Sequence, residues 1–328
     1  MQKPVRWGII GAAKFAREQM GPAIHAAKGA ELAALATASP EKADGFRAFC
    51  PGIEVHGSYE ALLADPGIEA VYIPLPHTLH VPWALKALEA GKHVLVEKPV
   101  AMRAAEIDPL IAARDRSGLM ATEAYMIVHH PQWQAARKLL SEGAIGKLLN
   151  VDGFFSYDNR ADPGNIRNRP DTGGGSLPDI GVYTCGSTRW MTGEEPLSVR
   201  AEITRENGVE VTTHMRARFP GFGFTGTTSM RMHPRQEMIF HGETGVIRLT
   251  APFNAGLFGE ARVELHRGMS VSVERFPSAN HYVLQVEAFG RTLRDGAAYP
   301  WSLEDARGTQ AMLDMALAGE IGREQATA

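Results

Sequence analysis

The 328-residue sequence is poor in cysteine and has little excess of charge of either sign. Cys50 and Cys185 are its only cysteines, which excludes a disulfide framework and a cysteine-based zinc cluster and fits a reducing compartment. A formal net charge of −3 gives no electrostatic reason to bind nucleic acid or an anionic membrane. The longest uncharged stretch, residues 70–85, contains three prolines and is shorter than the ~20 apolar residues of a membrane helix.

The composition is that of an ordinary soluble globular chain, which excludes disorder and fibrous repeats. Apolar residues make up 44% of the chain and charged residues 22%, which is ordinary for a folded domain. At about 150 residues per domain, the length predicts two domains. Residues 1–4 lead directly into a strand-like run and are too short for a signal peptide. We therefore expect a cytoplasmic protein with a small-molecule substrate, no nucleic-acid or membrane partner, and no metal.

Strand and helix patterns alternate over residues 1–125. Apolar runs predict strands at residues 5–10, 31–37, 69–74, 93–97 and 119–123, with helical segments between them. This alternation predicts an α/β fold whose first domain is a doubly wound, parallel Rossmann sheet.

Residues 126–328 follow a different pattern. After a helix at 129–142, short strands and tight turns such as Asn207-Gly208 predict hairpins. Two helices at 281–295 and 303–319 close the chain. We expect an α+β domain with an open, mostly antiparallel sheet.

The first strand ends in a variant of a dinucleotide-binding fingerprint. The sequence from Gly11 to Ala16 matches G-x-G-x-x-A, except that Ala13 holds the second glycine position. The first glycine permits a tight turn, the last small residue permits helix–strand packing, and the free N–H groups at the helix start attract phosphates. The spacing favours a phosphate-binding turn over a merely structural one.

The end of the second strand indicates which nicotinamide cofactor is bound. An acid there would bind the ribose diol of NAD and repel a 2′-phosphate, but the sequence is Thr37-Ala38-Ser39. Thr37 and Ser39 can donate hydrogen bonds to a phosphate, and Lys42 lies one helical turn further on. The pattern favours NADP, although Ala38 occupies the place where an arginine would decide the question, so NAD stays possible.

Lys98 follows the strand predicted at residues 93–97, within Glu97-Lys98-Pro99. Ligands of open α/β sheets collect at the carboxyl ends of the strands, so Lys98 is placed to reach a nicotinamide. The alternative is a solvated lysine beside an acid.

A second group of polar residues follows a run of three glycines at residues 173–175. Asp179 and Tyr183 are four apart and would share one face of a helix. The glycines would let the backbone approach a flat ligand. A lysine, a tyrosine and an aspartate together supply the proton transfer that carbonyl–alcohol redox chemistry requires. A phenol titrates near 10, so its use at pH 7 needs about 4 kcal/mol, and an ammonium about 4 Å away supplies that amount at an effective dielectric of 20.

Several further stretches identify a family resemblance. They are residues 8–11 (GIIG), 73–80 (IPLPHTLH), 90–99 (AGKHVLVEKP), 143–146 (GAIG), 162–168 (DPGNIRN) and the glycine run with Asp179 and Tyr183. The chain resembles the Gfo/Idh/MocA oxidoreductases over nearly its whole length, and within them the dihydrodiol/D-xylose 1-dehydrogenase branch.

The resemblance implies roles for individual residues. Lys98 and Tyr183 become the catalytic pair, with Asp179 as the supporting acid. The expected cofactor contacts are Gly11, Ala12, Ala13, Lys14, Phe15, Ala16, Thr37, Ala38, Ser39, Lys42, Pro74, Leu75, Pro76, His77, His80, Glu97, Lys98 and Arg167. The expected substrate contacts are Lys98, Tyr157, Arg167, Asp179 and Tyr183. The resemblance also implies NADP and pairing of subunits through the open sheet, hence a homodimer or higher oligomer.

The function expected from these residues is hydride transfer between NADP and a sugar or polyol-like alcohol or carbonyl, as in an aldose 1-dehydrogenase. Three alternatives stay open. The substrate could be a trans-dihydrodiol or dicarbonyl, or the enzyme could exchange hydride between two aldoses with a tightly bound cofactor. The chain could also be a non-catalytic nucleotide sensor, although a sensor has no need of Lys98, Asp179 and Tyr183.

Overall fold

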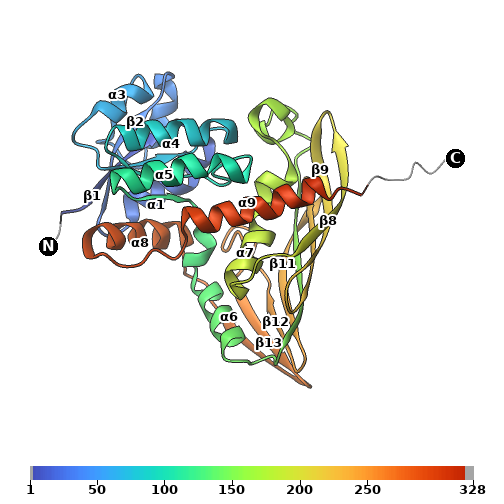
Figure 1. Cartoon of the computed structure of the whole chain (residues 1–328). Helices are drawn as coiled ribbons and strands as arrows, with labels where there is room; N and C mark the ends of the chain where they lie inside the picture. The colour runs from blue at the N-terminus through green and yellow to red at the C-terminus, as the bar shows by residue number, and fades with distance from the viewer. Residues whose placement is uncertain (1–2, 322–328) are drawn as a thin grey trace. The chain divides into compact units, whose positions relative to one another are not determined.

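The computed structural model describes residues 3–321, and these form two compact units (Figure 1). Unit 1 comprises the described residues of Met1–Ala101, Ala105–His129 and Asn280–Ala306, and unit 2 those of Met102–Ala104, His130–Ala279 and Arg307–Ala328. Sequence analysis places one boundary, between residues 125 and 126. The structure differs because Asn280–Ala306 returns to unit 1, where the ring of Phe289 packs 4.7 Å from that of Trp7.

Unit 1 contains a six-stranded parallel sheet in the order β3-β2-β1-β4-β5-β6. The strands are β1 (Val5–Ile10), β2 (Ala30–Ala36), β3 (Glu54–His56), β4 (Ala70–Ile73), β5 (His93–Val96) and β6 (Ala121–Glu123). This order confirms the doubly wound Rossmann sheet. Strand β3, three residues long, is absent from the sequence prediction.

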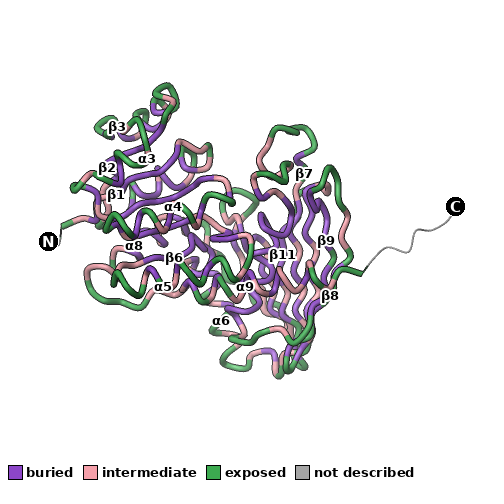
Figure 2. The backbone as a smooth tube through the Cα atoms, turned by 45° about the horizontal axis from the view of Figure 1, so that its top comes forward, coloured by how far each residue is buried: buried purple, intermediate pink, exposed green. Residues whose placement is uncertain are grey.

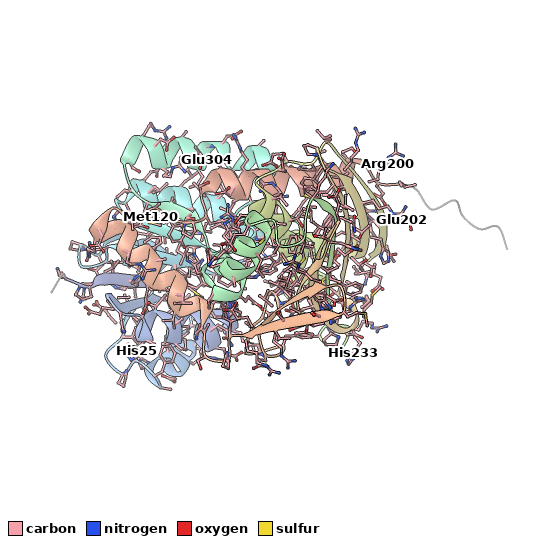
Figure 3. All side chains as sticks on the ribbon, turned by 90° about the horizontal axis from the view of Figure 1, so that it is seen from below. His25, Met120, Arg200, Glu202, His233 and Glu304 are labelled. Carbon is pink, nitrogen blue, oxygen red and sulfur yellow. The ribbon has the colours of Figure 1, made fainter. Side chains whose placement is uncertain are left out.

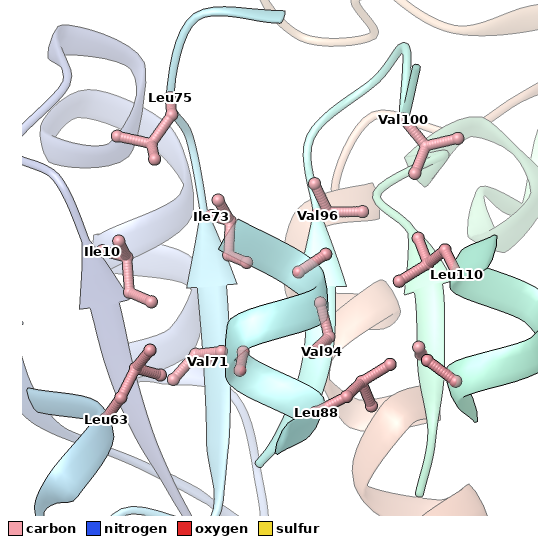
Figure 4. Close-up of a cluster of buried hydrophobic side chains, with 14 of the residues drawn as sticks. Ile10, Leu63, Val71, Ile73, Leu75, Leu88, Val94, Val96, Val100 and Leu110 are labelled. Atoms are coloured by element: carbon pink, nitrogen blue, oxygen red, sulfur yellow. The ribbon is translucent and has the colours of Figure 1, made fainter. Parts of the chain in front are cut away.

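Helices cover both faces of this sheet. They are a π-helix (Ala16–Met20), α1 (Gly21–Ala26), α2 (Asp44–Arg47), α3 (Tyr59–Ala64), α4 (His80–Glu89), α5 (Asp108–Ser117), α8 (His281–Asp295) and 3-10 turns at Pro40–Ala43, His77–Leu79, Ala104–Glu106 and Met126–His129. α3, α4 and α5 bury apolar side chains against one face, where Ile10, Val71 and Val94 meet Leu63, Leu88 and Leu110 (Figure 4). α1 and α8 pack on the other face. Ser58 caps α3, its hydroxyl accepting from the Ala61 N–H at 3.1 Å.

Unit 2 contains an eight-stranded sheet in the order β14-β13-β12-β11-β7-β10-β9-β8. The strands are β7 (Leu148–Asp158), β8 (Ser198–Glu206), β9 (Val209–Arg218), β10 (Gly223–Ser229), β11 (Arg231–Gly242), β12 (Val246–Leu249), β13 (Arg262–Arg267) and β14 (Ser270–Arg275). Only the β10–β7 pair is parallel, so the mostly antiparallel sheet is confirmed. Asn207 and Gly208 have φ of 50° and 79°, as the predicted hairpin between β8 and β9 requires.

The helices of unit 2 lie on one face of this sheet (Figure 1). They are α6 (Pro131–Ser141), a π-helix (Leu177–Gly181), α7 (Val182–Thr192), residues 307–318 of α9 (Leu303–Ala318) and 3-10 turns at Ile166–Asn168 and Pro170–Thr172. α6 packs on β12 and β13, and α7 packs on β7. Buried residues alternate with half-buried ones along β12 and most of β7, and buried segments predominate around β7, β9 and β11 (Figure 2). On the opposite face Arg200 and Glu202 are exposed, and their side chains point outward (Figure 3).

Between residues 3 and 321, no helix is both long and apolar enough to cross a membrane.

Candidate functional site

The turn after β1 has the backbone that a dinucleotide-binding turn needs. Gly11 has φ of +104°, and a Cβ there would lie 2.8 Å from Cδ2 of Leu75. Helical residues begin at Lys14, and the fully buried Ala16 opens the π-helix. A tight turn, a small residue at the packing position and a helix start beside a central parallel strand fit a nicotinamide dinucleotide.

The end of β2 presents two polar side chains towards solvent. Ser39 is half-buried and Lys42 is exposed. Thr37 is 6% exposed, and its hydroxyl accepts from the Ser39 N–H at 3.1 Å. Thr37 therefore shapes the turn, which leaves Ser39 and Lys42 as the accessible groups for a 2′-phosphate.

His80 connects the loop after β4 to the loop after β5. Its ring nitrogens lie 2.7 Å from the carbonyl oxygens of Leu75 and Pro99, and the side chain is fully buried. Burial is the main cause that lowers the pKa of His80 to about 4; the charge of Lys98 acts in the same direction, and the contacts with the Pro99 and Leu75 carbonyls oppose it. The neutral ring has a single N–H and donates to one carbonyl at a time. His80 thus holds in place the loops that carry Pro74, Pro76, His77 and Lys98.

Lys98 is half-buried and follows β5 by two residues. The carboxylate of Glu97 accepts from the hydroxyl of Tyr72 at 2.6 Å and from the N–H of Lys98 at 3.2 Å. The Glu97 carboxylate is therefore held by a backbone N–H and by a side chain of the neighbouring strand β4.

In unit 2, Asp179 joins two of the predicted site residues. It is 3% exposed, its Oδ1 lies 2.9 Å from Nε of Arg167, and its Oδ2 accepts from the hydroxyl of Tyr157 at 2.6 Å. Asp179 raises the pKa of the Arg167 guanidinium, while burial and Asp179 raise the pKa of the Tyr157 phenol. The structure therefore assembles Tyr157, Asp179 and Arg167 as a polar cluster with an ionised carboxylate and a neutral phenol.

Tyr183 is the second residue of α7, which directly follows the π-helix that carries Asp179. It is 6% exposed, and its ring packs against those of Phe155 and Phe253, at 5.8 and 5.5 Å between centroids. Tyr183 contributes to the raised pKa of Arg167, so the phenol and the guanidinium interact electrostatically.

The glycine run before this helix has a role different from the one expected. We expected residues 173–175 to let the backbone approach a ligand. Gly175 has φ of +137°, and a Cβ there would overlap the Glu210 carboxylate. A Cβ on Gly174 would overlap the carbonyl oxygen of Arg167. The glycines therefore make room for protein atoms that shape the helix start.

Glu210 of β9 caps the helix that carries Asp179 and Tyr183. It is 7% exposed, and its Oε1 accepts from the Leu177 N–H at 2.7 Å. Burial raises the pKa of Glu210 to about 8, against the hydrogen bonds from the Leu177 and Ser176 amides. This carboxyl satisfies amide groups that a helix start leaves unpaired.

Glu210→Gln is expected to change how stability depends on pH. Because the folded protein raises the pKa of Glu210, it binds more protons than the unfolded chain between about pH 4.5 and pH 8. Stability therefore falls as the pH rises through this window. We expect the difference in Tm, wild type minus Glu210→Gln, to fall by several degrees between pH 5 and pH 8.5. The conversion used is about 1 °C of Tm for a few tenths of a kcal/mol of stability. Calorimetry of both proteins measures this, and parallel Tm curves would contradict it.

Sequence analysis missed Glu210 and Arg231. Arg231 donates through Nη1 to Oδ1 of Asn159 at 2.7 Å and through Nη2 to Oδ1 of Asn168 at 3.2 Å, fixing the loop that carries Arg167. Both residues act at a distance of more than 30 positions along the chain, so no local motif marks them. Asn280 caps α8 by accepting from the Tyr282 N–H at 3.0 Å.

Between residues 3 and 321, one group combines a histidine and acids at spacings that a metal could use. Glu54, His56 and Asp65 have their ligand atoms within 4.8 Å of one another. His56 lies 3.4 Å from Asp65 and 3.8 Å from Glu54, and Glu54 is exposed. His56 and Asp65 are half-buried, and nothing connects the group to the residues above.

Comparison with known proteins gives the family. The family model of oxidoreductases with an NAD-binding Rossmann fold matches residues 5–125, and the Gfo/Idh/MocA C-terminal domain matches residues 133–248. A dTDP-3,4-didehydro-2,6-dideoxy-α-D-glucose 3-reductase of Saccharopolyspora spinosa is 34% identical over 90% of each chain. An NADP-dependent D-xylose 1-dehydrogenase of Haloferax volcanii is 31% identical over 88% of this chain and 89% of its own.

A solved structure agrees with these relatives. A 3-ketoreductase from Actinomadura kijaniata, in complex with NADP and TDP-benzene, superposes with a TM-score of 0.89 at 29% identity, covering 97% of this chain and 98% of its own. Both domain models and both units of the fold point to the same group of enzymes. The chain is an NAD(P)-dependent oxidoreductase of the Gfo/Idh/MocA family.

Proposed function

We propose that this oxidoreductase uses NADP to oxidise a sugar at its anomeric carbon, or to reduce the corresponding carbonyl. The observation that carries the proposal is the Tyr157–Asp179–Arg167 cluster at the start of the helix that carries Tyr183. The partly exposed guanidinium of Arg167 and the phenol of Tyr157, together with that of Tyr183, offer donors and acceptors suited to an uncharged polyol.

Tyr183 is the proposed general acid–base, and Lys98 is the proposed cation that favours its phenolate. In the oxidative direction the Tyr183 oxygen takes the hydroxyl proton while the C–H bond breaks, and a lactone forms. Bound NADP+ supplies the hydride acceptor. In the reverse direction Tyr183 returns the proton to the new alkoxide. Asp179 holds Arg167, whose charge also favours the phenolate.

The test is turnover by the wild-type protein. We expect NADPH formation, followed at 340 nm, with at least one member of a panel of aldopentoses and aldohexoses. Absence of turnover across the panel with both cofactors would refute the aldose proposal.

A second candidate is reduction of a keto-sugar carried on a nucleotide, which the S. spinosa and A. kijaniata relatives favour. The loop between β7 and the π-helix of Asp179 argues for an uncharged substrate instead. Arg160 lies 2.5 Å from Asp158, and Arg169 lies 2.5 Å from Asp171, so each of these arginines is neutralised within its own loop. The second candidate would be favoured if NADPH oxidation with a dTDP-keto-sugar is faster than NADP+ reduction with any aldose.

The proposed preference for NADP depends on Lys42 and Ser39. Lys42→Gln is expected to raise the KM for NADP+ about fivefold to tenfold, because a charge-assisted bond to phosphate contributes about 1 to 1.4 kcal/mol at an exposed site. The KM for NAD+ is the internal control and should change less than twofold. An equal change for both cofactors would place Lys42 outside the 2′-phosphate site.

We also propose that the protein self-associates through the face of the unit 2 sheet that its helices leave open. In register across β7, β11, β12 and β13, this face presents Asp152, Ile239, Arg248 and Glu264. Charges of both signs around an apolar residue suit pairing with a second copy of the same surface.

Ile239→Lys is expected to convert a dimer into a monomer. Each subunit would bury this side chain, and a lysine on a two-fold interface meets its own copy and costs several kcal/mol. Light scattering after gel filtration measures the mass. Leu197→Lys, at an exposed residue that precedes β8 and lies outside this face, is the control. A monomeric wild type, or a dimer unaffected by Ile239→Lys, would contradict the proposal.

A further inference from the structure

The carboxyl of Glu123 lies buried at the end of β6, beside the segment that carries Lys98. Glu123 is 3% exposed and is paired in register with Val96, the last residue of β5. Lys98 follows Val96 by two residues. Glu123 is therefore at the carboxyl edge of the sheet, where ligands of this fold class bind, although no sequence motif singles it out.

Both carboxyl oxygens of Glu123 accept hydrogen bonds from N–H groups. Oε1 accepts from the Val100 amide at 2.9 Å, and Oε2 accepts from the Trp301 indole at 2.9 Å. Trp301 is 1% exposed, stacks on Tyr125 at 4.0 Å, and accepts at its carbonyl from the Thr122 hydroxyl at 2.7 Å. The carboxyl thus connects the backbone just after Lys98 to a rigid aromatic pair.

Three ionisable side chains act on this region together with Glu123. Glu97 and Lys98 come from the end of β5, and His80 comes from α4, in contact with the Pro99 carbonyl. Burial raises the pKa of Glu123 to about 7, with Glu97 adding to the increase and Lys98 opposing it. Tyr72 holds Glu97 by a hydrogen bond of 2.6 Å. Two N–H donors favour the ionised form of Glu123, so its negative charge and the Lys98 ammonium stabilise each other.

We propose that Glu123 is a positioning residue for Lys98. It fixes the backbone just after Lys98 through the Val100 amide, and its carboxylate places a negative charge beside the segment that carries Lys98. The proposal rests on the catalytic role proposed for Lys98. It requires that removal of the charge change the chemistry of Lys98, whereas a merely structural Glu123 would change only stability.

The test measures Lys98 directly and needs no turnover. Competitive acylation with acetic anhydride between pH 7 and 11, read by peptide mass spectrometry, gives the midpoint pH of Lys98 labelling. Glu123→Gln is expected to lower this midpoint by about 1 pH unit, the effect of one charge at about 6 to 12 Å for an effective dielectric of 40 to 20. Trp301→Phe, which removes one hydrogen bond and keeps the carboxylate, should leave it unchanged. An unchanged midpoint in folded Glu123→Gln overturns the proposal.

A measurement on the wild-type protein tests the proposal even if Glu123→Gln fails to fold. Carboxyl 13C shifts of glutamate-labelled protein follow the ionisation of Glu123 itself, and we expect it to ionise below pH 9. A carboxyl that stays protonated through pH 9 supplies no charge to Lys98 and overturns the proposal.

Kinetics provide the functional readout. Glu123→Gln is expected to lower kcat about tenfold and to leave the KM for NADP+ within twofold, while Glu123→Asp, which keeps the charge, recovers part of the loss. Full kcat in folded Glu123→Gln would also overturn the proposal. If the wild type shows no turnover, the proposed function fails while the Lys98 labelling still decides the role of Glu123.

Discussion

Tyr183→Phe is expected to lower kcat by about 10²–10⁴-fold, the range for loss of a positioned general acid–base. This corresponds to about 3 to 5.5 kcal/mol of transition-state stabilisation. The ring packs between Phe155 and Phe253, and phenylalanine preserves that packing. The Tm and the KM for NADP+ should therefore stay near wild type. Steady-state kinetics with the best substrate of the aldose panel measure the effect.

Lys98→Met is the companion variant that separates charge from proton transfer. It retains the phenol but removes the ammonium, so kcat should fall and the pH at which oxidation becomes fast should rise. Activity above a tenth of wild type in Tyr183→Phe, or full activity in Lys98→Met, would contradict the proposed catalytic pair.

Gly175→Ala is expected to destabilise unit 2 by about 3 kcal/mol or more and to abolish activity. Gly175 has φ of +137°, a backbone conformation that essentially only glycine adopts, and the added methyl group would overlap the Glu210 carboxylate. Relief of the overlap would displace the group that caps the helix of Asp179 and Tyr183. Chemical denaturation followed by tryptophan fluorescence measures the loss.

Gly221→Ala is the matched control for this glycine. It lies in the turn before β10, and a Cβ there would have no atom within 4 Å. Its free energy of unfolding should stay within about 0.5 kcal/mol of wild type. If the two variants have equal free energies of unfolding, the absence of a side chain at Gly175 is not required for stability, and the prediction fails.

Local patterns predicted most elements of the fold. Strand β1 and helix α8 have the predicted bounds, residues 5–10 and 281–295. Apolar periodicity and capping residues are local signals, and they are strong in these segments. Strand β3 lacks such a signal, because three residues at a sheet edge show no period. The return of α8 to unit 1 depends on Phe289 meeting Trp7, a pairing that periodicity does not encode.

The candidate site was predicted in part. The Gly11 turn has the positive φ that its motif requires, and Tyr157, Arg167 and Asp179 lie together as one cluster. The partners of Asp179 could not be read from its spacing to Tyr183, because they come from β7 and from the 3-10 turn at Ile166–Asn168. For the same reason the glycine run was interpreted as a ligand approach, when Glu210 of β9 occupies the space.

The sequence by itself determined the class of this protein, because a phosphate-binding turn, alternating strands and helices, and a lysine after a strand are each encoded within a few residues. Only the tertiary structure decided which groups control the polar side chains. Glu210 reaches the helix of Tyr183, and Glu123 reaches the amide after Lys98, from other strands. Burial and electrostatic effects at such contacts depend on distances in space. These distances are set by how strands far apart in the sequence pack together.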